Sequence, residues 1–172
     1  MHYFAQAERQ VGNHVTRADD FEHRQIGDRR KRVSDAQKQE IATSITNRHC
    51  EATGAPPFFV QVVIEEEGSS KRFIGGLATT EYIWIRVDMR AGRSEEQREA
   101  LMLHIVGDVS RISGIPAENV WINLCMLEPT DMVEYGRVLP GPGKEQQWFE
   151  TLPLSVRMRL ESLGIDQHKF QL

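Results

Sequence analysis

The sequence predicts a two-layer α+β fold in which a tandem β-α-β repeat forms a mixed sheet with its helices on one face. The first observation behind this prediction is an internal repeat with a constant offset of 60 residues, such as that between Ser34 and Ser94. In each copy a serine that can cap a helix is followed by a helical pattern, a glycine, a proline and a strand. The identical pairs are Ser34/Ser94, Gln37/Gln97, Ile45/Ile105, Gly54/Gly114, Pro56/Pro116 and Val60/Val120. We expect each copy to join parallel strands through a right-handed crossover.

The second observation is the alternation of apolar and polar side chains over residues 83–89, which is typical of a strand with one buried face. The third concerns the other face of the predicted sheet, since two helices can cover only one face of four strands. That face would carry Gln61, Val63, Trp84, Trp121, Asn123 and Cys125. It is too apolar to stay in water, so a symmetric oligomer is expected.

The elements follow in an order that a single domain over residues 1–172 accommodates. The first β-α-β unit spans 1–66 and contains a charged insertion at about 10–32, the second spans 83–128, and a C-terminal tail at 129–172 wraps the body. We expect strands at 2–7, 58–64, 83–89 and 120–126, helices at 34–54, 94–112 and near 153–163, and a brief hairpin at 73–74. The basic cluster at 29–32 is a solvated charge run, a nuclear address or a polyanion contact, and the acidic chain favours the first.

Composition narrows the class of protein. A net charge of −4 and a pI of about 5.9 give no electrostatic reason to bind nucleic acid or an anionic membrane. No apolar run approaches the ~20 residues of a membrane span, and the start of the chain lacks the apolar core of a signal peptide. Two cysteines, Cys50 and Cys125, are expected to be reduced thiols. We therefore expect a cytoplasmic protein.

Candidate binding residues lie where the strand at 83–89 ends. Arg90 and Arg93 stand beside the N-terminus of a helix that Ser94 opens. Two guanidiniums, free backbone N–H groups and the positive end of the helix dipole favour a small anion, most simply a carboxylate. The alternative is a pair of solvated arginines that pair with nearby acids. The six histidines show no metal-ligand spacing, and no phosphate loop or dinucleotide turn is present, so neither metal nor cofactor is expected.

Longer motifs give a resemblance over about residues 33–152. They are Arg90-Ala-Gly-Arg93-Ser, Val120-Trp121, Met132-Val-Glu-Tyr-Gly-Arg-Val-Leu-Pro140, Pro142-Gly and Trp148-Phe149. With these motifs the chain resembles the tautomerase superfamily, and within it the group of cis-3-chloroacrylic acid dehalogenase. The resemblance implies a fused pair of β-α-β units assembled as a homotrimer. It also implies hydration, dehalogenation or tautomerisation of a small unsaturated or 2-oxo carboxylic acid without a cofactor.

The resemblance also implies roles for individual residues. Arg90 and Arg93 match the pair that binds the substrate carboxylate, Glu134 matches the glutamate that activates water, and His49 matches a histidine that helps to bind substrate and water. By helix spacing alone, His49 would instead be a core histidine bonded to the backbone.

Two positions depart from the family pattern. The superfamily uses an amino-terminal proline as acid or base, whereas this sequence starts Met1-His2. A free α-amine, with a pKa of about 7.7–8.0, can still donate a proton, so Met1 is the expected acid. A tyrosine that assists water activation is replaced by Asn123, which can form hydrogen bonds but is not a phenol.

Two alternatives stay open beside the enzyme hypothesis. A non-catalytic relative would keep the pocket to bind a small carboxylate, or persist as a structural trimer. Alternatively, the insertion and the start of the sequence would come from misassigned gene boundaries, and the true chain would begin with proline.

Overall fold

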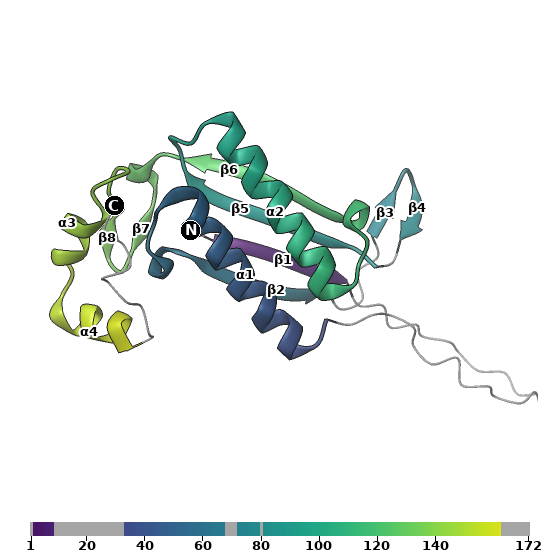
Figure 1. Cartoon of the computed structure of the whole chain (residues 1–172), viewed down its shortest axis with the longest axis horizontal. Helices are drawn as coiled ribbons and strands as arrows, with labels where there is room; N and C mark the ends of the chain where they lie inside the picture. The colour runs from purple at the N-terminus through teal and green to yellow at the C-terminus, as the bar shows by residue number, and fades with distance from the viewer. Residues whose placement is uncertain (1, 9–32, 68–71, 80, 163–172) are drawn as a thin grey trace, which may run out of the picture.

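A computed structural model describes residues 2–8, 33–67, 72–79 and 81–162 (Figure 1). Met1 and the predicted insertion at about 10–32 lie outside these residues. Four strands form the main sheet, in the order β2-β1-β5-β6. They are β1 (His2–Glu8), β2 (Gln61–Glu67), β5 (Ile83–Arg90) and β6 (Val120–Leu127).

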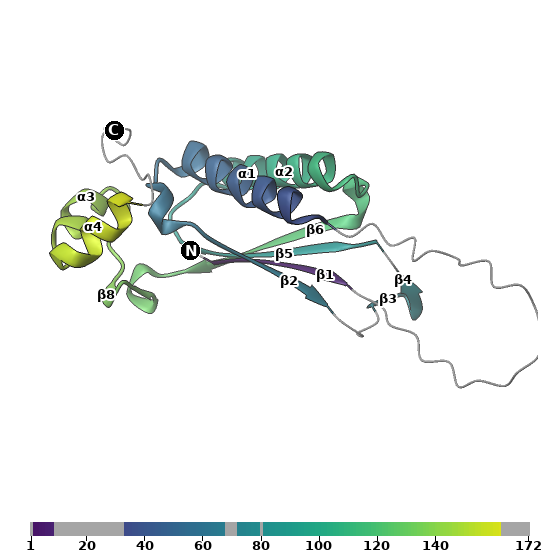
Figure 2. The ribbon, with the colours of Figure 1, turned by 90° about the horizontal axis from the view of Figure 1, so that it is seen from below.

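The sheet is mixed, as predicted. β1 is parallel to β2 and β5 is parallel to β6, while β1 and β5 run antiparallel at the centre. Helices α1 (Asp35–Thr53) and α2 (Glu95–Ser113) lie side by side on one face of this sheet (Figure 2). The remaining elements are η1 (Pro57–Phe59), β3 (Arg72–Ile74), β4 (Leu77–Thr79), η2 (Ala117–Asn119), η3 (Pro129–Asp131), β7 (Val133–Glu134), β8 (Arg137–Val138), α3 (Glu145–Glu150) and α4 (Leu154–Ser162).

The two helices begin and end in the same way because their caps are repeated. Ser34 Oγ accepts the Gln37 N–H at 3.2 Å, and the Gln37 side chain accepts the Ser34 N–H at 2.9 Å, which is a capping box. Ser94 and Gln97 form the same pair of bonds. Gly54 and Gly114 end the helices with φ of 68° and 70°, a left-handed conformation that glycine adopts at little cost.

The strand predicted at 58–64 begins later than expected. Residues Pro57–Phe59 form the 3-10 turn η1, in which the Val60 N–H donates to Pro57 O at 2.9 Å, and β2 starts at Gln61. Pro57 fixes φ in the helical range and has no N–H to give a strand ladder. The turn leaves Phe58 and Phe59 buried away from the sheet.

Buried apolar side chains of the described residues form two clusters. The larger lies between the helices and the sheet, where Ile45, Ile85 and Ile105 are at most 1% exposed. The smaller joins the tail to η1, with Phe58 and Phe149 rings 5.1 Å apart and Phe59 and Trp148 rings 5.1 Å apart. The tail is therefore packed on the end of the β-α-β body, beside the last residues of α1.

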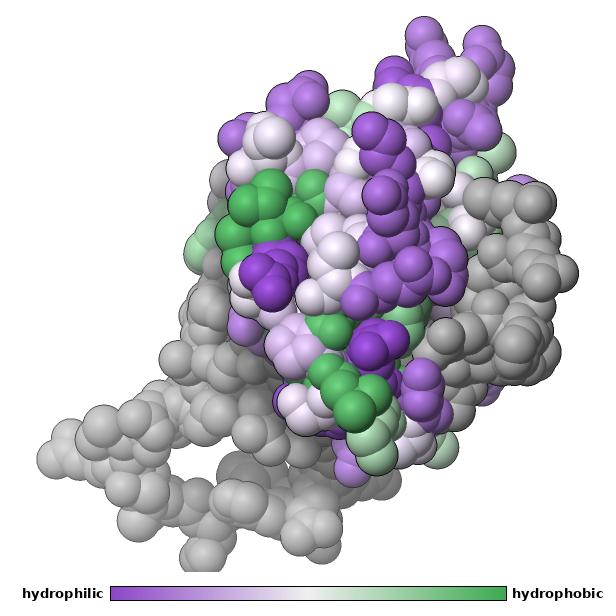
Figure 3. Space-filling view, turned by 90° about the vertical axis from the view of Figure 1, so that its left-hand side faces the viewer, coloured by the Kyte–Doolittle hydropathy of each residue, from purple (hydrophilic) through white to green (hydrophobic). Residues whose placement is uncertain are grey.

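Among the described residues, no helix covers the face of the sheet away from α1 and α2, which we call the open face (Figure 2). Trp121 on this face is 51% exposed and packs edge-on against Tyr82. Trp84 Nε1 donates to Asn123 Oδ1 at 2.9 Å on the same face. Apolar side chains are exposed on the tail as well, where Figure 3 shows separate patches among hydrophilic residues. Those of the tail are Val133, Val138, Leu154 and Met158. Across the described residues, none of the helices has the length and apolar character needed to cross a membrane.

Candidate active site

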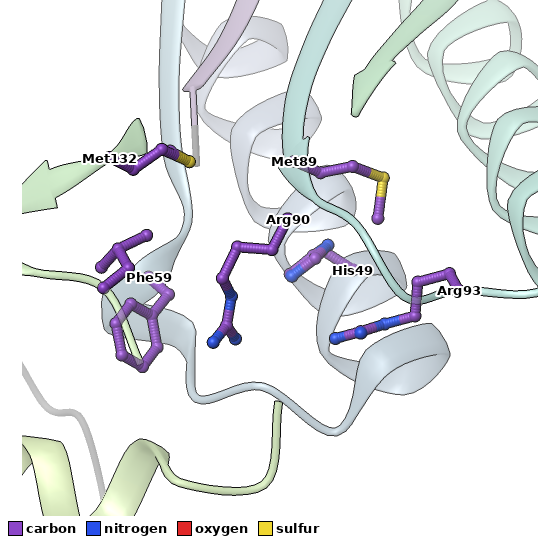
Figure 4. Close-up of a pocket in the computed structure, with 7 residues that line it drawn as sticks. His49, Phe59, Met89, Arg90, Arg93 and Met132 are labelled. Carbon is purple, nitrogen blue, oxygen red and sulfur yellow. The ribbon is translucent and has the colours of Figure 1, made fainter. Parts of the chain in front are cut away.

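A small cavity lies where β5 ends and the tail meets the body (Figure 4). Its volume is about 10 Å³, which is room for about one water molecule. Arg90 is the last residue of β5, Arg93 lies in the loop before α2, and His49 comes from the last turns of α1. The complete lining is His49, Phe59, Met89, Arg90, Arg93, Met132 and Leu139. Three predicted site residues thus meet at one cavity.

Arg90 is held firmly by groups of the tail. Its Nη1 donates to Pro140 O at 2.7 Å and its Nη2 donates to Glu145 Oε1 at 2.7 Å. The guanidinium also stands over the Phe59 ring, 5.3 Å from the ring centre, and the residue is 6% exposed. The two hydrogen bonds use two of its five N–H donors and fix the guanidinium before any ligand binds.

Arg93 has a different environment. Its Nε is buried and finds no hydrogen-bond acceptor among the residues that the structure describes. Burial, followed by the nearby charge of Arg90, lowers the pKa of Arg93, while Glu145 opposes this effect. A guanidinium remains charged at neutral pH despite such a shift, so this group requires an anion or water as partner.

His49 is 2% exposed, and its hydrogen bonds define its tautomer. Thr53 Oγ1 donates to His49 O at 2.8 Å and accepts the Ala55 N–H at 3.1 Å. The only hydroxyl proton of Thr53 is used in the bond to His49 O. The contact of 3.1 Å between Thr53 Oγ1 and His49 Nε2 therefore requires the imidazole proton to be on Nε2. Nδ1 then carries a lone pair and can only accept. Burial, followed by the charge of Arg93, lowers the pKa of His49 to about 3, so the ring is neutral at pH 7.

Glu134 belongs to a tight hairpin of the tail. Tyr135 and Gly136, between β7 and β8, have φ of 52° and 77°, as in a turn of the type I′ class. The Tyr135 hydroxyl donates to Phe58 O at 2.6 Å, which ties this strained residue to η1. Glu134 is half-buried and does not line the cavity, but it is two residues after Met132, which does. Alternate residues of an extended segment share a side, so both side chains point to the same side of the strand.

Asn123 is not brought into the cavity of its own chain. Asn123 lies in β6 on the open face, where its amide Nδ2 contacts Cys125 Sγ at 3.6 Å. Met1 is outside the described residues. In the register of the sheet His2 is opposite Asp88, so β1 starts at the same end of the sheet at which β5 ends with Arg90. No group of three or more potential metal ligands occurs within the described ranges.

A second, larger cavity adjoins the first through Arg93, which lines both. Its volume is about 220 Å³, and it lies between the end of α1, the start of α2 and the tail. Its lining is Ala52, Thr53, Gly54, Gly92, Arg93, Gln97, Pro142, Gly143 and Glu145. The sequence did not point to Glu145, because only the packed tail brings it to Arg90. Thr53 lies four residues after His49, so helical spacing could have indicated its contact with the ring.

A fused β-α-β fold with arginines at the end of the third sheet strand defines a protein of the tautomerase class. Residues 24–151 match the family model described as "Putative oxalocrotonate tautomerase enzyme", and the chain belongs to this family. No curated protein matches the sequence.

Solved structures agree with this assignment. The structure described as N1, a member of the cis-3-chloroacrylic acid dehalogenase family, is 26% identical, with a TM-score of 0.76 over 94% of this chain and 99% of that one. RhCC from Rhodococcus jostii RHA1 is 17% identical, with a TM-score of 0.63 over 90% and 99%. The fused 4-OT called Q0, a symmetric trimer, is 19% identical, with a TM-score of 0.60 over 78% and 91%. The last two show the fold alone.

Proposed function

We propose that this protein is a cofactor-independent enzyme that hydrates, dehalogenates or tautomerises a small unsaturated or 2-oxo carboxylic acid. The observation that carries the proposal is the buried Arg93 Nε, which finds no acceptor among the described residues, beside a neutral His49 and within the part of the chain that matches the family model. A carboxylate bound there would gain charge-assisted hydrogen bonds in a site largely shielded from water.

The reaction would proceed in two coupled steps on a 2,3-unsaturated acid. Arg93, aided by the charge of Arg90, holds the carboxylate and draws electron density toward it, so that C3 becomes electrophilic. Water hydrogen-bonds to His49 Nδ1 and loses a proton to Glu134 as its oxygen bonds to C3. The α-ammonium of Met1 gives a proton to C2. If C3 carries a halide, the resulting halohydrin loses the halide ion from C3 and the hydroxyl proton to solvent, and the C3 carbonyl forms.

We further propose that the chain works as a homotrimer. The open sheet face exposes Trp121 and is apolar enough to favour burial against a second copy. A similar fused 4-OT structure is described as a symmetric trimer. On this face Asn123 would serve the site of a neighbouring copy instead of its own.

The second candidate function is binding of a small carboxylate without turnover. The observation that favours it is the engagement of Arg90 by Glu145 and Pro140, which fixes the guanidinium and offsets its charge, so that Arg90 contributes less to holding an acid than Arg93 does. A cavity with room for about one water also has to open before an acid reaches His49.

Turnover measurements separate the two functions. Purified protein is incubated with 3-haloacrylates, an acetylenic acid and phenylenolpyruvate, and loss of substrate is followed by ultraviolet absorbance. Glu134→Gln should lower kcat by about 10²–10⁴-fold, as expected for loss of a general base. Arg93→Ala should raise KM. Arg111→Ala, which alters an exposed arginine of α2, should change neither kcat nor KM. Binding without turnover would favour the second candidate, and an Arg93→Ala variant with unaltered binding would contradict both.

A further inference from the structure

We propose that Glu145 is a specificity-determining residue that restricts the site to acids with a single carboxylate. The inference rests on the proposed function, because it deepens the substrate class of that same site. The evidence for this role of Glu145 is the set of charged side chains that line the two cavities.

Glu145 and Arg90 form an ion pair that is largely buried. The carboxylate Oε1 accepts from Arg90 Nη2 at 2.7 Å, and the two side chains are 12% and 7% exposed. Glu145 begins α3, which Trp148 and Phe149 anchor in the aromatic cluster of the tail. A pair this buried resists separation, because breaking it would leave two charges without a partner. The pair is therefore a fixed part of the site.

Glu145 and Arg93 both line the larger cavity, of about 220 Å³, and the charge of Glu145 acts directly on Arg93. An acid that reaches Arg93 through this cavity meets a cation and an anion on the same walls. Its own carboxylate can bind the unpaired Nε of Arg93.

The titratable residues lining the two cavities are His49, Arg90, Arg93 and Glu145. With the histidine neutral, two positive charges and one negative charge leave a net charge of +1. The Glu134 carboxylate and the Met1 α-ammonium, in the roles proposed above, carry opposite charges and leave this sum unchanged. One carboxylate balances that charge. A second carboxylate would face Glu145 where burial limits the screening by solvent, and like charges so placed repel strongly.

Two acids of nearly the same shape test the proposal. Crotonate and fumarate are both trans unsaturated acids, and at neutral pH fumarate carries a carboxylate where crotonate has a methyl group. Dissociation constants for both are measured by titration calorimetry at constant ionic strength. We expect the native protein to bind crotonate at least about tenfold more tightly than fumarate, and Glu145→Gln to reduce or reverse that ratio by about tenfold or more.

Matched variants exclude indirect effects. Glu150→Gln removes an exposed carboxylate of the same helix and should keep the native ratio. Glu145→Asp keeps the charge and should keep the preference for crotonate, even if the tail packs less well. Thermal unfolding of each variant is recorded first, to confirm that the chain is folded.

Each result bears on one proposal or on both. A ratio that Glu145→Gln leaves unchanged, or fumarate binding more tightly to the native protein, overturns the charge restriction while the carboxylate site stands. The expected ratios without turnover of any acid support the restriction and count against the proposed reaction. Failure of both acids to bind either the native protein or Glu145→Gln overturns both proposals.

Discussion

Replacement of Thr53 by valine tests the assignment of the His49 tautomer. Valine has nearly the shape of threonine but lacks the hydroxyl, so it removes the acceptor of both the His49 Nε2–H and the Ala55 N–H. Each buried donor left without an acceptor costs about 1–3 kcal/mol. The imidazole can avoid its share of this cost by moving its proton to Nδ1. We therefore expect a loss of stability, a change of tautomer, or both.

The sequence repeat supplies a matched control for this variant. Ser113, the equivalent of Thr53, donates to Val109 O at 2.6 Å and accepts the Ile115 N–H at 3.1 Å, with no histidine in contact. Ser113→Ala should therefore cost only the backbone share, about 1–3 kcal/mol. Thr53→Val should exceed this by up to about 1–3 kcal/mol, unless the ring changes its tautomer.

Urea unfolding measures the free energies, and ¹⁵N-histidine NMR spectra identify the tautomer. The native protein and Thr53→Ser should show the proton on Nε2, and Thr53→Val should shift the population toward Nδ1–H. The assignment of the His49 proton to Nε2 fails if Thr53→Val is no less stable than Ser113→Ala and its His49 signal is unchanged. It also fails if the native ring carries its proton on Nδ1.

Two further predictions concern stability. The pKa of His49 falls from 6.5 to about 3 on folding, so between these pH values the unfolded chain binds more protons and the free energy of unfolding should decline as pH falls. Urea midpoints plotted against pH should therefore show a slope that His49→Gln reduces. Equal slopes for the native protein and the variant would contradict the low pKa. Phe149→Ala should cost about 3–5 kcal/mol because the ring is 4% exposed against Phe58, whereas Phe73→Ala, at a residue 58% exposed, should change the free energy of unfolding by less than about 0.5 kcal/mol. A loss of stability in Phe149→Ala as small as that expected for Phe73→Ala would show that the tail cluster does not stabilise the fold.

Much of the fold could be predicted because its signals are local. The capping pair of Ser34 and Gln37 and the left-handed Gly54 each involve groups within one helical turn, and the same signals recur in the second copy. The predicted strand at 58–64 began too early because Pro57 formed a 3-10 turn, a local effect that could have been read from the two adjacent prolines.

The candidate site could be predicted only in part. Sequence motifs selected His49, Arg90 and Arg93, and the fold gathers them at one cavity. Their roles, and those of Met1 and Glu134, stay predictions. Asn123 lies on the open face, away from the cavity of its own chain, since side chains alternate along β6.

The sequence by itself thus determined the repeated β-α-β units, the open sheet face and the choice of arginines. Only the tertiary structure decided which of those arginines forms an ion pair with a side chain of the tail. Arg90 is 55 residues from its partner Glu145, a separation that no periodic pattern spans. The partner is selected by the aromatic packing that docks the tail on η1, and the same packing leaves Arg93 facing the cavities. Hydrogen-bond partners across such distances depend on the packed chain as a whole, whereas caps and alternation depend on a few neighbouring residues.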